Sequence, residues 1–495
     1  MVALFIEGFD KYGAPSETAA NIQTLMAGEW TTFAINSIIA PLSANGQALG
    51  LGTGGGGMVK TIGGPYNRLI GGFRFASDLA RTTGIQAQAT GTAEWSVTIN
   101  TTGLISIRTG NTSGTAIATT STGAISANAV HYLEWDVTRG ASGAYNVYLD
   151  GTLVLTGTGN TGATDINQIA IIGSSNAGGF KLDDLYLFDS TGGENNAPLL
   201  TNPVVETTYA TADSAVAFTF SAGTLGPDYS LTTNTNAPGA NELFLRKFTP
   251  GVAATINSVS CLPAATSAGA NLKAVIYSDS AGAPHTLLSS GTQVTGTTSG
   301  TLLTGALTTP QALTAGTPYW IGFITYTSVA LTEVDTTTTG EKAANTYASG
   351  APGTAPAMTA GQASWMIFGN VTGVTGNNWS ASSQNPPTVL GDLSYVSSST
   401  VGQEDLYTWG ALPVTPSAIY TAAVKAFCRN TDAGVRTVSM RTKSGSTDSG
   451  GSLTGQTPAQ TYGWLSSYFD TDPNTSAAWG TTALNSATSG MKVDS

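Results

Sequence analysis

The feature that most constrains the fold of this chain is a series of short segments rich in strand-forming residues, each bounded by Gly, Asn, Ser or Asp. β-Branched and aromatic side chains pack well on a pleated surface, and the bounding residues favour turns. The alternation is clear in 144–151, where Tyr145, Val147 and Leu149 fall on one face of an expected strand. Helix formers such as Glu, Lys, Arg and Gln are scarce. The sequence therefore predicts an all-β protein of several antiparallel β-sandwich or jelly-roll domains in series.

At 495 residues the chain is too long for one small core, and its turn-rich stretches suggest four regions. We predict a first sandwich over 1–195, a connection over 196–242 and a second sandwich over 243–372. The last region, 373–495, is predicted to be a β-rich module. The connection opens with the linker NNAPLLTNPVVE and holds one strand candidate, AVAFTFSAG. The sequence leaves open which sandwich residues 207–242 join.

The charge of the chain argues against two classes of partner. Only 10% of the residues are charged, the net charge is −12, and no basic run exceeds two residues. Nucleic acid and anionic lipid require a basic surface, so we expect no nucleic-acid partner. No window approaches 18 apolar residues, so we expect no membrane insertion. The opening MVALFIEGFD lacks the basic start of a secretory signal, and we expect synthesis in a cytoplasm.

Two stretches in the first region resemble a known architecture. YLEWDVTRGASGAYNVYLDGTLV, over 132–154, is followed about 25 residues later by FKLDDLYLFD, over 180–189. Together they resemble the concanavalin A-like, laminin-G-type jelly roll, over about residues 1–195. The resemblance implies that fold but no particular ligand.

A second resemblance rests on the ends of the chain. GDLSYVSSSTVGQEDLYTWGALP, VKAFCRNTDAGVRTVSMRTKSGSTDSGG, YFDTDPNTSAAW and the terminal GMKV are similar to modules of tailed-bacteriophage virion proteins, as is the opening VALFIEGFDKYG. The likeness spans nearly the whole chain. It implies a non-enzymatic structural protein on the particle surface, made in the host cytoplasm and released by lysis.

The resemblance leaves two functions open. The first is structural: a tail appendage such as a tail fibre, or a capsid decoration or head fibre, in contact with other virion proteins and forming a homo-oligomer. The alternative is a receptor-binding adhesin that serves host attachment by recognising a host-surface glycan through its jelly rolls. Glycan binding usually needs an exposed aromatic side chain with polar groups beside it, and sequence does not tell which aromatic residues are exposed.

Asp183 and Asp184 are the most conspicuous candidates for chemistry. Adjacent residues of a regular strand point to opposite faces, so the two carboxylates diverge and do not share a metal or a proton unless a bulge intervenes. We expect one to meet solvent and the other to meet backbone N–H groups of a loop. Beyond them, Leu185 and Leu187 should point one way and Tyr186 and Phe188 the other, so neighbouring protein should cover both faces. Calcium remains the one cofactor considered near this pair.

Glu134 and Asp136 are the nearest approach to a glycosidase carboxylate pair, because they fall at alternate positions of one expected strand. Leu133 and Trp135 should lie on the opposite face. This arrangement suits a solvated strand face against a packed one, so we assign no catalytic residue here.

Asp470, Asp472 and Asn474 have the spacing that opens a calcium-binding loop. Such a loop needs Gly at its sixth position and Glu at its twelfth, where this chain has Thr475 and Thr481. We therefore expect a turn stabilised by local side-chain hydrogen bonds, with an incidental calcium site as the alternative.

Three further patterns predict no active site. The glycine-rich 52–61 lacks the Gly-Lys-Ser/Thr of a phosphate loop and is interpreted as a flexible hairpin loop. His131, expected at the start of a strand, and His285, expected in a turn, are the only histidines, and no G-x-S-x-G accompanies them. Cys261 and Cys428 are expected to be buried free thiols.

Overall fold

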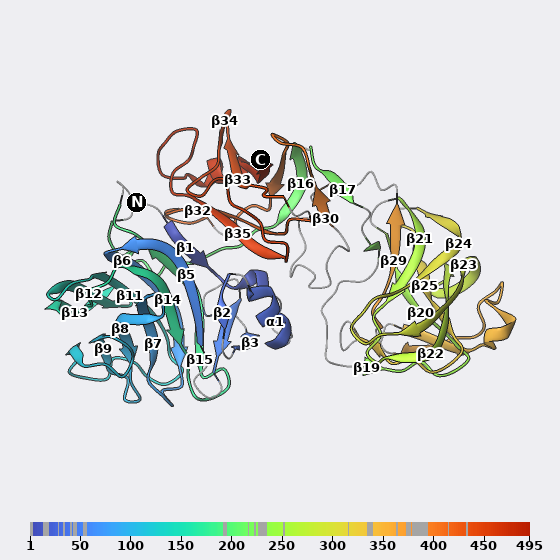
Figure 1. The fold of residues 1–495 in the computed structure, drawn as a ribbon, viewed down its shortest axis with the longest axis horizontal. Helices are drawn as coiled ribbons and strands as arrows, with labels where there is room; N and C mark the ends of the chain where they lie inside the picture. The colour runs from blue at the N-terminus through green and yellow to red at the C-terminus, as the bar shows by residue number, and fades with distance from the viewer. Residues whose placement is uncertain are drawn as a thin grey trace. The chain divides into compact units, whose positions relative to one another are not determined.

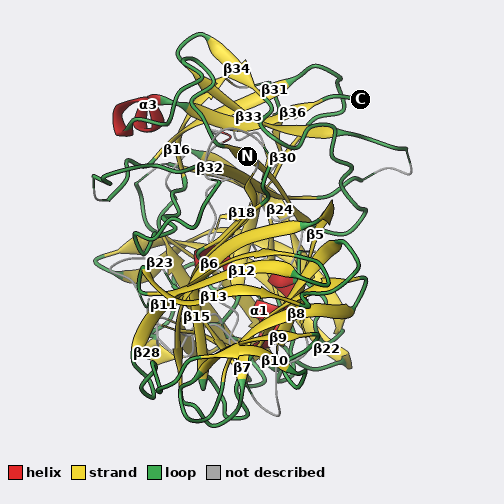
Figure 2. Cartoon of the chain, turned by 90° about the vertical axis from the view of Figure 1, so that its left-hand side faces the viewer, coloured by secondary structure: helices red, strands yellow, loops and turns green. Residues whose placement is uncertain are grey.

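A computed structural model shows a chain made almost entirely of strands, with short helices (Figures 1 and 2). It describes residues 3–12, 19–27, 29–32, 35–39, 42, 47–52, 57–191, 196–215, 217–221, 224–225, 235–250, 253–314, 316–333, 340–362, 365–372, 378, 395–413, 415–431 and 434–495. Within the sheets of this part, each strand pairs antiparallel to its neighbours. The predicted all-β class is confirmed.

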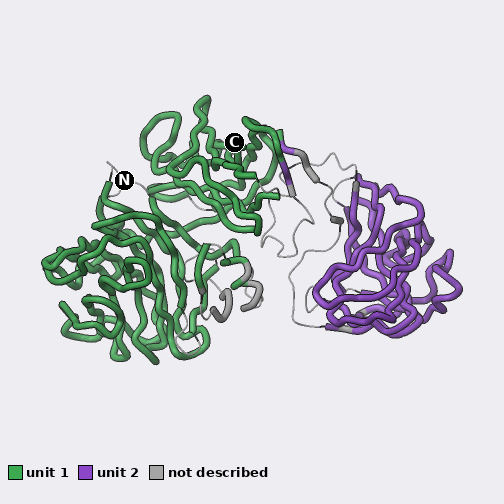
Figure 3. Tube along the Cα trace, viewed as in Figure 1, with its two compact units in different colours: residues 1–217, 383–389, 398–495 green, residues 218–382, 390–397 purple. Residues whose placement is uncertain are grey.

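The chain forms two compact units (Figure 3). The first contains residues 1–217, 383–389 and 398–495, and the second contains 218–382 and 390–397. Residues 398–495 thus belong to the same unit as the N-terminal sandwich. The boundaries expected from the sequence for consecutive domains stay a prediction.

The N-terminal part of the first unit is a sandwich of two sheets. The eight-stranded sheet has the order β13 (Thr152–Gly159), β12 (Gly143–Leu149), β11 (Val130–Thr138), β6 (Arg68–Ser77), β15 (Phe180–Phe188), β4 (Ala48–Leu51), β3 (Ile35–Ile39), with β1 (Ala3–Glu7) also paired to β15. The seven-stranded sheet has the order β10 (Ala116–Thr119), β9 (Ile105–Thr109), β8 (Thr92–Ile99), β7 (Thr83–Ala89), β14 (Ile166–Ile172), β5 (Gly57–Tyr66), β2 (Thr31–Thr32). Two short helices, η1 (Asp10–Tyr12) and α1 (Ala19–Met26), follow β1.

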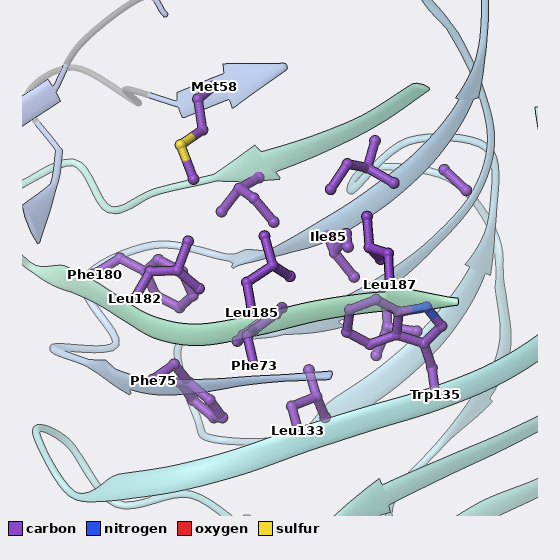
Figure 4. Close-up of a cluster of buried hydrophobic side chains, with 14 of the residues drawn as sticks. Met58, Phe73, Phe75, Ile85, Leu133, Trp135, Phe180, Leu182, Leu185 and Leu187 are labelled. Atoms are coloured by element: carbon purple, nitrogen blue, oxygen red, sulfur yellow. The ribbon is translucent and has the colours of Figure 1, made fainter. Parts of the chain in front are cut away.

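The core of this sandwich follows from the two-residue alternation of its strands. Leu185 and Leu187 of β15 point inward beside Trp135 and Leu133 of β11 (Figure 4). Tyr186 and Phe188 belong to a second apolar cluster on the outer face of the eight-stranded sheet. The predicted division of this strand between two covered faces is confirmed, as is the inward face of Tyr145, Val147 and Leu149.

The C-terminal part of the first unit is a five-stranded sheet with a separate strand pair. The sheet has the order β16 (Ala210–Ala215), β31 (Glu404–Trp409), β36 (Thr488–Val493), β33 (Val438–Ser444), β34 (Thr447–Ser449). The pair is β32 (Ala422–Cys428) with β35 (Gly463–Phe469). A short helix, α3 (Thr481–Ser486), lies between β35 and β36.

The second unit is built on a ten-stranded sheet that folds around an apolar core. The order is β18 (Thr224–Leu225), β29 (Ile367–Thr372), β21 (Ala254–Cys261), β24 (Leu303–Leu313), β23 (Ala283–Thr297), β22 (Ser267–Ser280), β25 (Tyr319–Thr325), β20 (Glu242–Phe248), β27 (Gly340–Ala344), β28 (Thr359–Gln362). Strand pairs β19 (Thr235–Asn236) with β26 (Leu331–Thr332) and β17 (Thr219–Ser221) with β30 (Tyr395–Ser397) accompany it. Ile256 of β21 and Phe323 of β25 lie in the same apolar cluster, so strands distant in the order face each other across the core.

Two expectations about glycine- and threonine-rich segments are corrected. Residues 57–61, expected in a flexible loop, belong to β5, and 53–56 lie outside the described residues. The low-complexity sequence of 296–309 predicts edge strands and loops, but β24 is an interior strand that pairs with both β21 and β23. In both cases the sheet neighbours supply hydrogen bonds that the low-complexity sequence does not reveal.

Candidate functional site: the acidic residues of the first unit

The Asp183–Asp184 pair sits on an irregularity of β15. The register of β15 against β6 shifts between Asp183 and Tyr186, and the φ angle of Asp184 is 49°. The bulge that the sequence could not reveal is therefore present. It breaks the alternation, so both aspartates are buried, each with 1% of its surface exposed. The expectation that one of them meets solvent is wrong.

Each of the two aspartates has its own structural partners. Asp183 accepts hydrogen bonds from the backbone N–H groups of Leu42 (3.1 Å) and Asp184 (2.9 Å). Asp184 accepts one from Nε of Arg74 (2.7 Å) and one from the backbone N–H of Val205 (2.8 Å). Burial, with the neighbouring charge of Asp184, raises the pKa of Asp183 to about 8. The expected contact with loop N–H groups is confirmed.

Glu134 and Asp136 of β11 also serve as structural acceptors. Glu134 is fully buried and accepts hydrogen bonds from the hydroxyl of Tyr186 (2.6 Å) and the N–H of Leu200 (3.0 Å). Asp136 accepts both from Nε and from Nη2 of Arg68, at 2.7 Å each. The expected solvated face is therefore wrong for Glu134, because another segment of the chain covers it. Burial raises the pKa of Glu134.

The covering segment, residues 196–206, is here called the strap. Leu199 and Val205 pack into the outer apolar cluster of the eight-stranded sheet. The carbonyl of Asn202 accepts a hydrogen bond from Arg74 (3.2 Å), and the carbonyl of Asn196 accepts one from Arg68 (3.3 Å). Asp184, Glu134 and Asp136 thus hold the strap on the sheet, directly or through these two arginines. Asp183 instead binds Leu42 and the N–H of Asp184.

A second group of charges is buried where the C-terminal part meets the N-terminal sandwich, and is called the charge cluster. It consists of Glu7, Lys11, Glu29, Lys60 and Lys425. Lys11 Nζ lies 2.8 Å from the Glu7 carboxylate and 2.5 Å from that of Glu29. Lys425 Nζ lies 3.1 Å from the Glu7 carboxylate and 3.8 Å from the Glu29 carboxylate. The exposed fractions of the five side chains range from 1% to 15%.

Hydrogen bonds and aromatic rings also stabilise the buried charges of the charge cluster. The hydroxyl of Tyr12 donates to Glu29 at 2.6 Å, and Lys425 donates to the carbonyl of Ile6 at 2.6 Å. Lys60 Nζ lies 4.4 Å and Lys425 Nζ 4.9 Å from the ring centre of Phe5. Buried charges need this degree of pairing to be tolerated.

The pKa shifts follow from that pairing. Burial alone would raise the pKa of Glu7, but the ammonium groups of Lys11 and Lys425 outweigh it and lower that pKa. Burial would lower the pKa of Lys425, and the two glutamates raise it instead. Lys60 has weaker pairing, so burial lowers its pKa to about 8.

Further contacts join the two ends of the chain. The indole N–H of Trp464 donates to the carbonyl of Leu25 (2.9 Å), and the ring of Trp464 meets Tyr12 edge to face at 6.3 Å. The N–H of Ala3 donates to the carboxylate of Asp470 (3.2 Å). The strand pair β32/β35 is therefore fixed to the first strand and the first helices of the sandwich.

The expected turn at Asp472 is confirmed. Its carboxylate accepts hydrogen bonds from the N–H of Asn474 (2.9 Å) and the hydroxyl of Thr475 (3.1 Å). Asp470 is engaged separately by Ala3, so the alternate acidic residues do not converge. Among the described residues, no group of three or more His, Cys, Asp or Glu side chains has a geometry that could hold a metal ion.

The histidines and cysteines lie apart. Nδ1 of His131 is 2.8 Å from the carboxylate of Asp150 in the first unit. His285 lies in β23 of the second unit, not in the turn expected from the sequence, because the strand resumes directly after Gly282. Both cysteines are free, with Cys261 buried and Cys428 half-buried, so burial of the second is only partial.

Comparisons with known proteins give only remote similarities. No protein-family model matches the chain, and no curated protein matches it. Among solved structures, domain 4 of AbnA, a GH43 extracellular arabinanase from Geobacillus stearothermophilus in complex with arabinotriose, is 15% identical; the match covers 38% of this chain and 92% of that one, with a TM-score of 0.28. A sialidase is 12% identical over 37% of this chain, with a TM-score of 0.26.

The receptor-binding domain of botulinum neurotoxin mosaic serotype C/D is also similar, at 12% identity over 37% of this chain and a TM-score of 0.25. The match covers 19% of the sialidase chain and 48% of the neurotoxin chain. These are similarities of part of one chain to part of another. Among the described helices, none is long and apolar enough to cross a membrane.

Proposed function

We propose that this protein is a non-enzymatic structural component on the surface of a tailed-bacteriophage particle, as a tail appendage or as a decoration or fibre of the head. The proposal joins the sequence resemblance at both chain ends to the way the acidic residues are used. Its partners are other virion proteins and further copies of the same chain. It is made in the host cytoplasm and leaves by lysis.

One observation carries the non-enzymatic part of the proposal. Of the carboxylates whose spacing suggested chemistry, Asp184 and Glu134 accept hydrogen bonds from the strap or from side chains beside it, and Asp183 accepts them from backbone N–H groups. A catalytic carboxylate must reach a substrate, whereas all three are buried and the strap contacts Asp184 and Glu134 directly. These carboxylates stabilise the fold by accepting hydrogen bonds, which is the role expected of a structural particle component.

The joining of the chain ends supports the structural part. Lys425 and Trp464 bind the C-terminal strand pair to residues of the first 30 positions. A unit closed in this way holds the C-terminal strand pair against the N-terminal sandwich. Such closure benefits a protein that must persist outside a cell, where no chaperone repairs local unfolding.

Localisation on particles is the test. An antibody against the purified chain, visualised with gold on particles of a phage that encodes it, should label the tail or the head surface. Label over the head would favour the decoration or head-fibre role, and label at the tail or its fibres would favour the appendage. Intact, infectious particles without label, from a lysate in which the chain is detected free, would overturn the proposal.

The second candidate function is that of an adhesin that recognises a host-surface glycan. It is favoured by one specific feature of the second unit, an exposed tyrosine surrounded by ordered polar side chains.

A further inference from the structure

One face of the sheet in the second unit is covered over only part of its length. Val275 and Tyr277 of β22 and Trp320 of β25 pack against the segment that begins with η2 (Tyr347–Ser349) and includes Met358. Residues of β22 two and four positions earlier, Lys273 and Asn271, fall on the same face by alternation. Lys273 and Asn271 lie beyond the apolar residues that the η2 segment covers, and their partners on β23, Gln293 and Thr295, are polar.

An aromatic side chain is exposed at this uncovered end. Tyr326 directly follows β25, and its N–H donates to the carbonyl of Asn271 at 2.9 Å. Half of it, 52%, is exposed, whereas its neighbour Tyr347 is only 7% exposed. The two ring centres are 5.6 Å apart with an interplanar angle of 60°. The buried ring therefore supports the exposed one and limits how it can move.

Ordered polar side chains flank the two rings. Tyr347 donates from its hydroxyl to Oε1 of Gln293 (3.0 Å). Nε2 of Gln293 donates to Oδ1 of Asn271 (3.0 Å) and to Oγ1 of Thr295 (3.2 Å). The Thr295 hydroxyl donates to the same Asn271 oxygen (2.8 Å). These side chains come from facing positions of β22 and β23, so they are fixed by the sheet as well as by each other.

One positive charge completes the group. Lys273 pairs in register with Gln293, and its Nζ lies 4.5 Å from the ring centre of Tyr347. The six side chains Asn271, Lys273, Gln293, Thr295, Tyr326 and Tyr347 are here called the tyrosine platform. With strands about 4.8 Å apart and alternate residues about 6.8 Å apart, the platform spans roughly 10 Å, the size of one or two sugar rings.

We propose that the tyrosine platform is a saccharide-binding site with a preference for sugars that carry a carboxylate. The exposed ring of Tyr326 offers a flat apolar surface to the C–H face of a sugar. The side-chain amide N–H groups of Asn271 and the hydroxyl of Thr295 offer hydrogen bonds to its hydroxyl groups. The ammonium of Lys273 supplies the attraction for the carboxylate.

The arrangement is better suited to a saccharide than to a folded protein partner. A stable protein interface needs on the order of 800 Å² per partner with an apolar centre, whereas this platform has one exposed ring among polar groups. Ordering these polar side chains before binding reduces the entropy lost when a ligand docks. The inference concerns the isolated chain and does not rest on where the protein sits on a particle.

The test uses the full chain on an array that carries bacterial surface oligosaccharides, both neutral ones and ones containing uronic acids. The wild type should bind a subset enriched in uronic acids. Tyr326→Ala should weaken that binding about tenfold, while Tyr326→Phe, which keeps the ring, should stay within about twofold. Lys273→Met should reduce binding to the acidic sugars and leave any neutral ligand nearly unaffected.

Two controls separate the site from general damage. Thr308→Ala alters an exposed residue on β24 of the same unit, outside the platform, and should bind like the wild type. Thermal unfolding of each variant checks that the second unit still folds. If the wild type binds no glycan on the array, or if Tyr326→Ala binds as well as Tyr326→Phe, the inference is overturned.

Discussion

Nζ of Lys425 lies 3.1 Å from a carboxylate oxygen of Glu7, although 418 residues separate them in sequence. The pair is buried, and Glu29 and Lys11 complete its surroundings. Such a contact cannot form until the chain is available as far as Lys425, long after Glu7. The N-terminal sandwich and the C-terminal strand pair are therefore linked by charge as well as by packing.

Lys425→Met should destabilise the first unit by about 3–5 kcal/mol, because the variant leaves Glu7 buried with one ammonium fewer and deprives the carbonyl of Ile6 of a donor. Urea unfolding followed by Trp fluorescence measures the change. Lys443→Met, at an exposed position of β33, is the matched control and should shift stability by less than about 0.5 kcal/mol. Equal effects of the two substitutions would contradict the proposed importance of the charge cluster.

The strands were predictable from the sequence because their causes are local. The alternation of Leu185 and Leu187 with Tyr186 and Phe188 depends only on the pleat of the strand, and the structure confirms it. The turn at Asp472 was predictable for the same reason, since its hydrogen bonds reach only two and three residues ahead.

The bulge and the long-range contacts were not predictable from the sequence. Asp184 adopts a positive φ because β15 has a shifted register against β6, and nothing in LDDL marks that shift. Lys425 is a single polar residue in an alternating stretch, and nothing in the local sequence indicates the carboxylates of Glu7 and Glu29 that it contacts. The strap was predicted to be a linker, because its turn residues do not indicate that it packs on a sheet face and binds Glu134.

Asp183→Asn should change how stability depends on pH. The folded-state pKa of Asp183 is about 8, above the ordinary value near 4, so the folded protein binds the extra proton between these limits. The stability that this proton provides is present at about pH 4 and is lost as the pH rises toward 8. Asparagine does not titrate, so the variant does not lose stability at this position as the pH rises.

The free energy of unfolding of Asp183→Asn, relative to that of the wild type, should therefore rise by up to about 1.4 kcal/mol per pH unit between pH 5 and pH 8. Denaturant unfolding at half-unit pH steps measures the difference. Asp10, whose pKa burial raises to about 7, is present in both proteins and contributes to the pH dependence of each. A difference that stays constant over this range would show that Asp183 is ionised in the folded state.

Gly71→Ala should destabilise the N-terminal sandwich by more than about 2 kcal/mol. A Cβ at this position of β6 would lie 2.5 Å from the indole ring of Trp135 and 2.8 Å from the side chain of Leu187, both in the packed core. Gly463→Ala, in strand β35 where a Cβ would meet nothing within 4 Å, is the control. The two thermal unfolding midpoints should differ by several degrees, with Gly71→Ala the lower.

Tyr186→Phe should loosen the strap without unfolding the sandwich. The substitution keeps the ring in the outer apolar cluster but removes the hydroxyl, which donates to Glu134 (2.6 Å) and accepts from the N–H of Leu199 (3.2 Å). Loss of one hydrogen bond to a charged group costs roughly 1.5–3 kcal/mol.

Hydrogen exchange measures the result locally. The amides of Leu199 and Leu200 should exchange at least about tenfold faster in Tyr186→Phe than in the wild type. The amide of Val205, which donates to Asp184 and not to this pair, is the internal reference and should change less. Uniform acceleration across the sheet would mean that the hydroxyl supports the whole sandwich, and unchanged exchange at Leu199 and Leu200 would mean that apolar packing alone holds the strap.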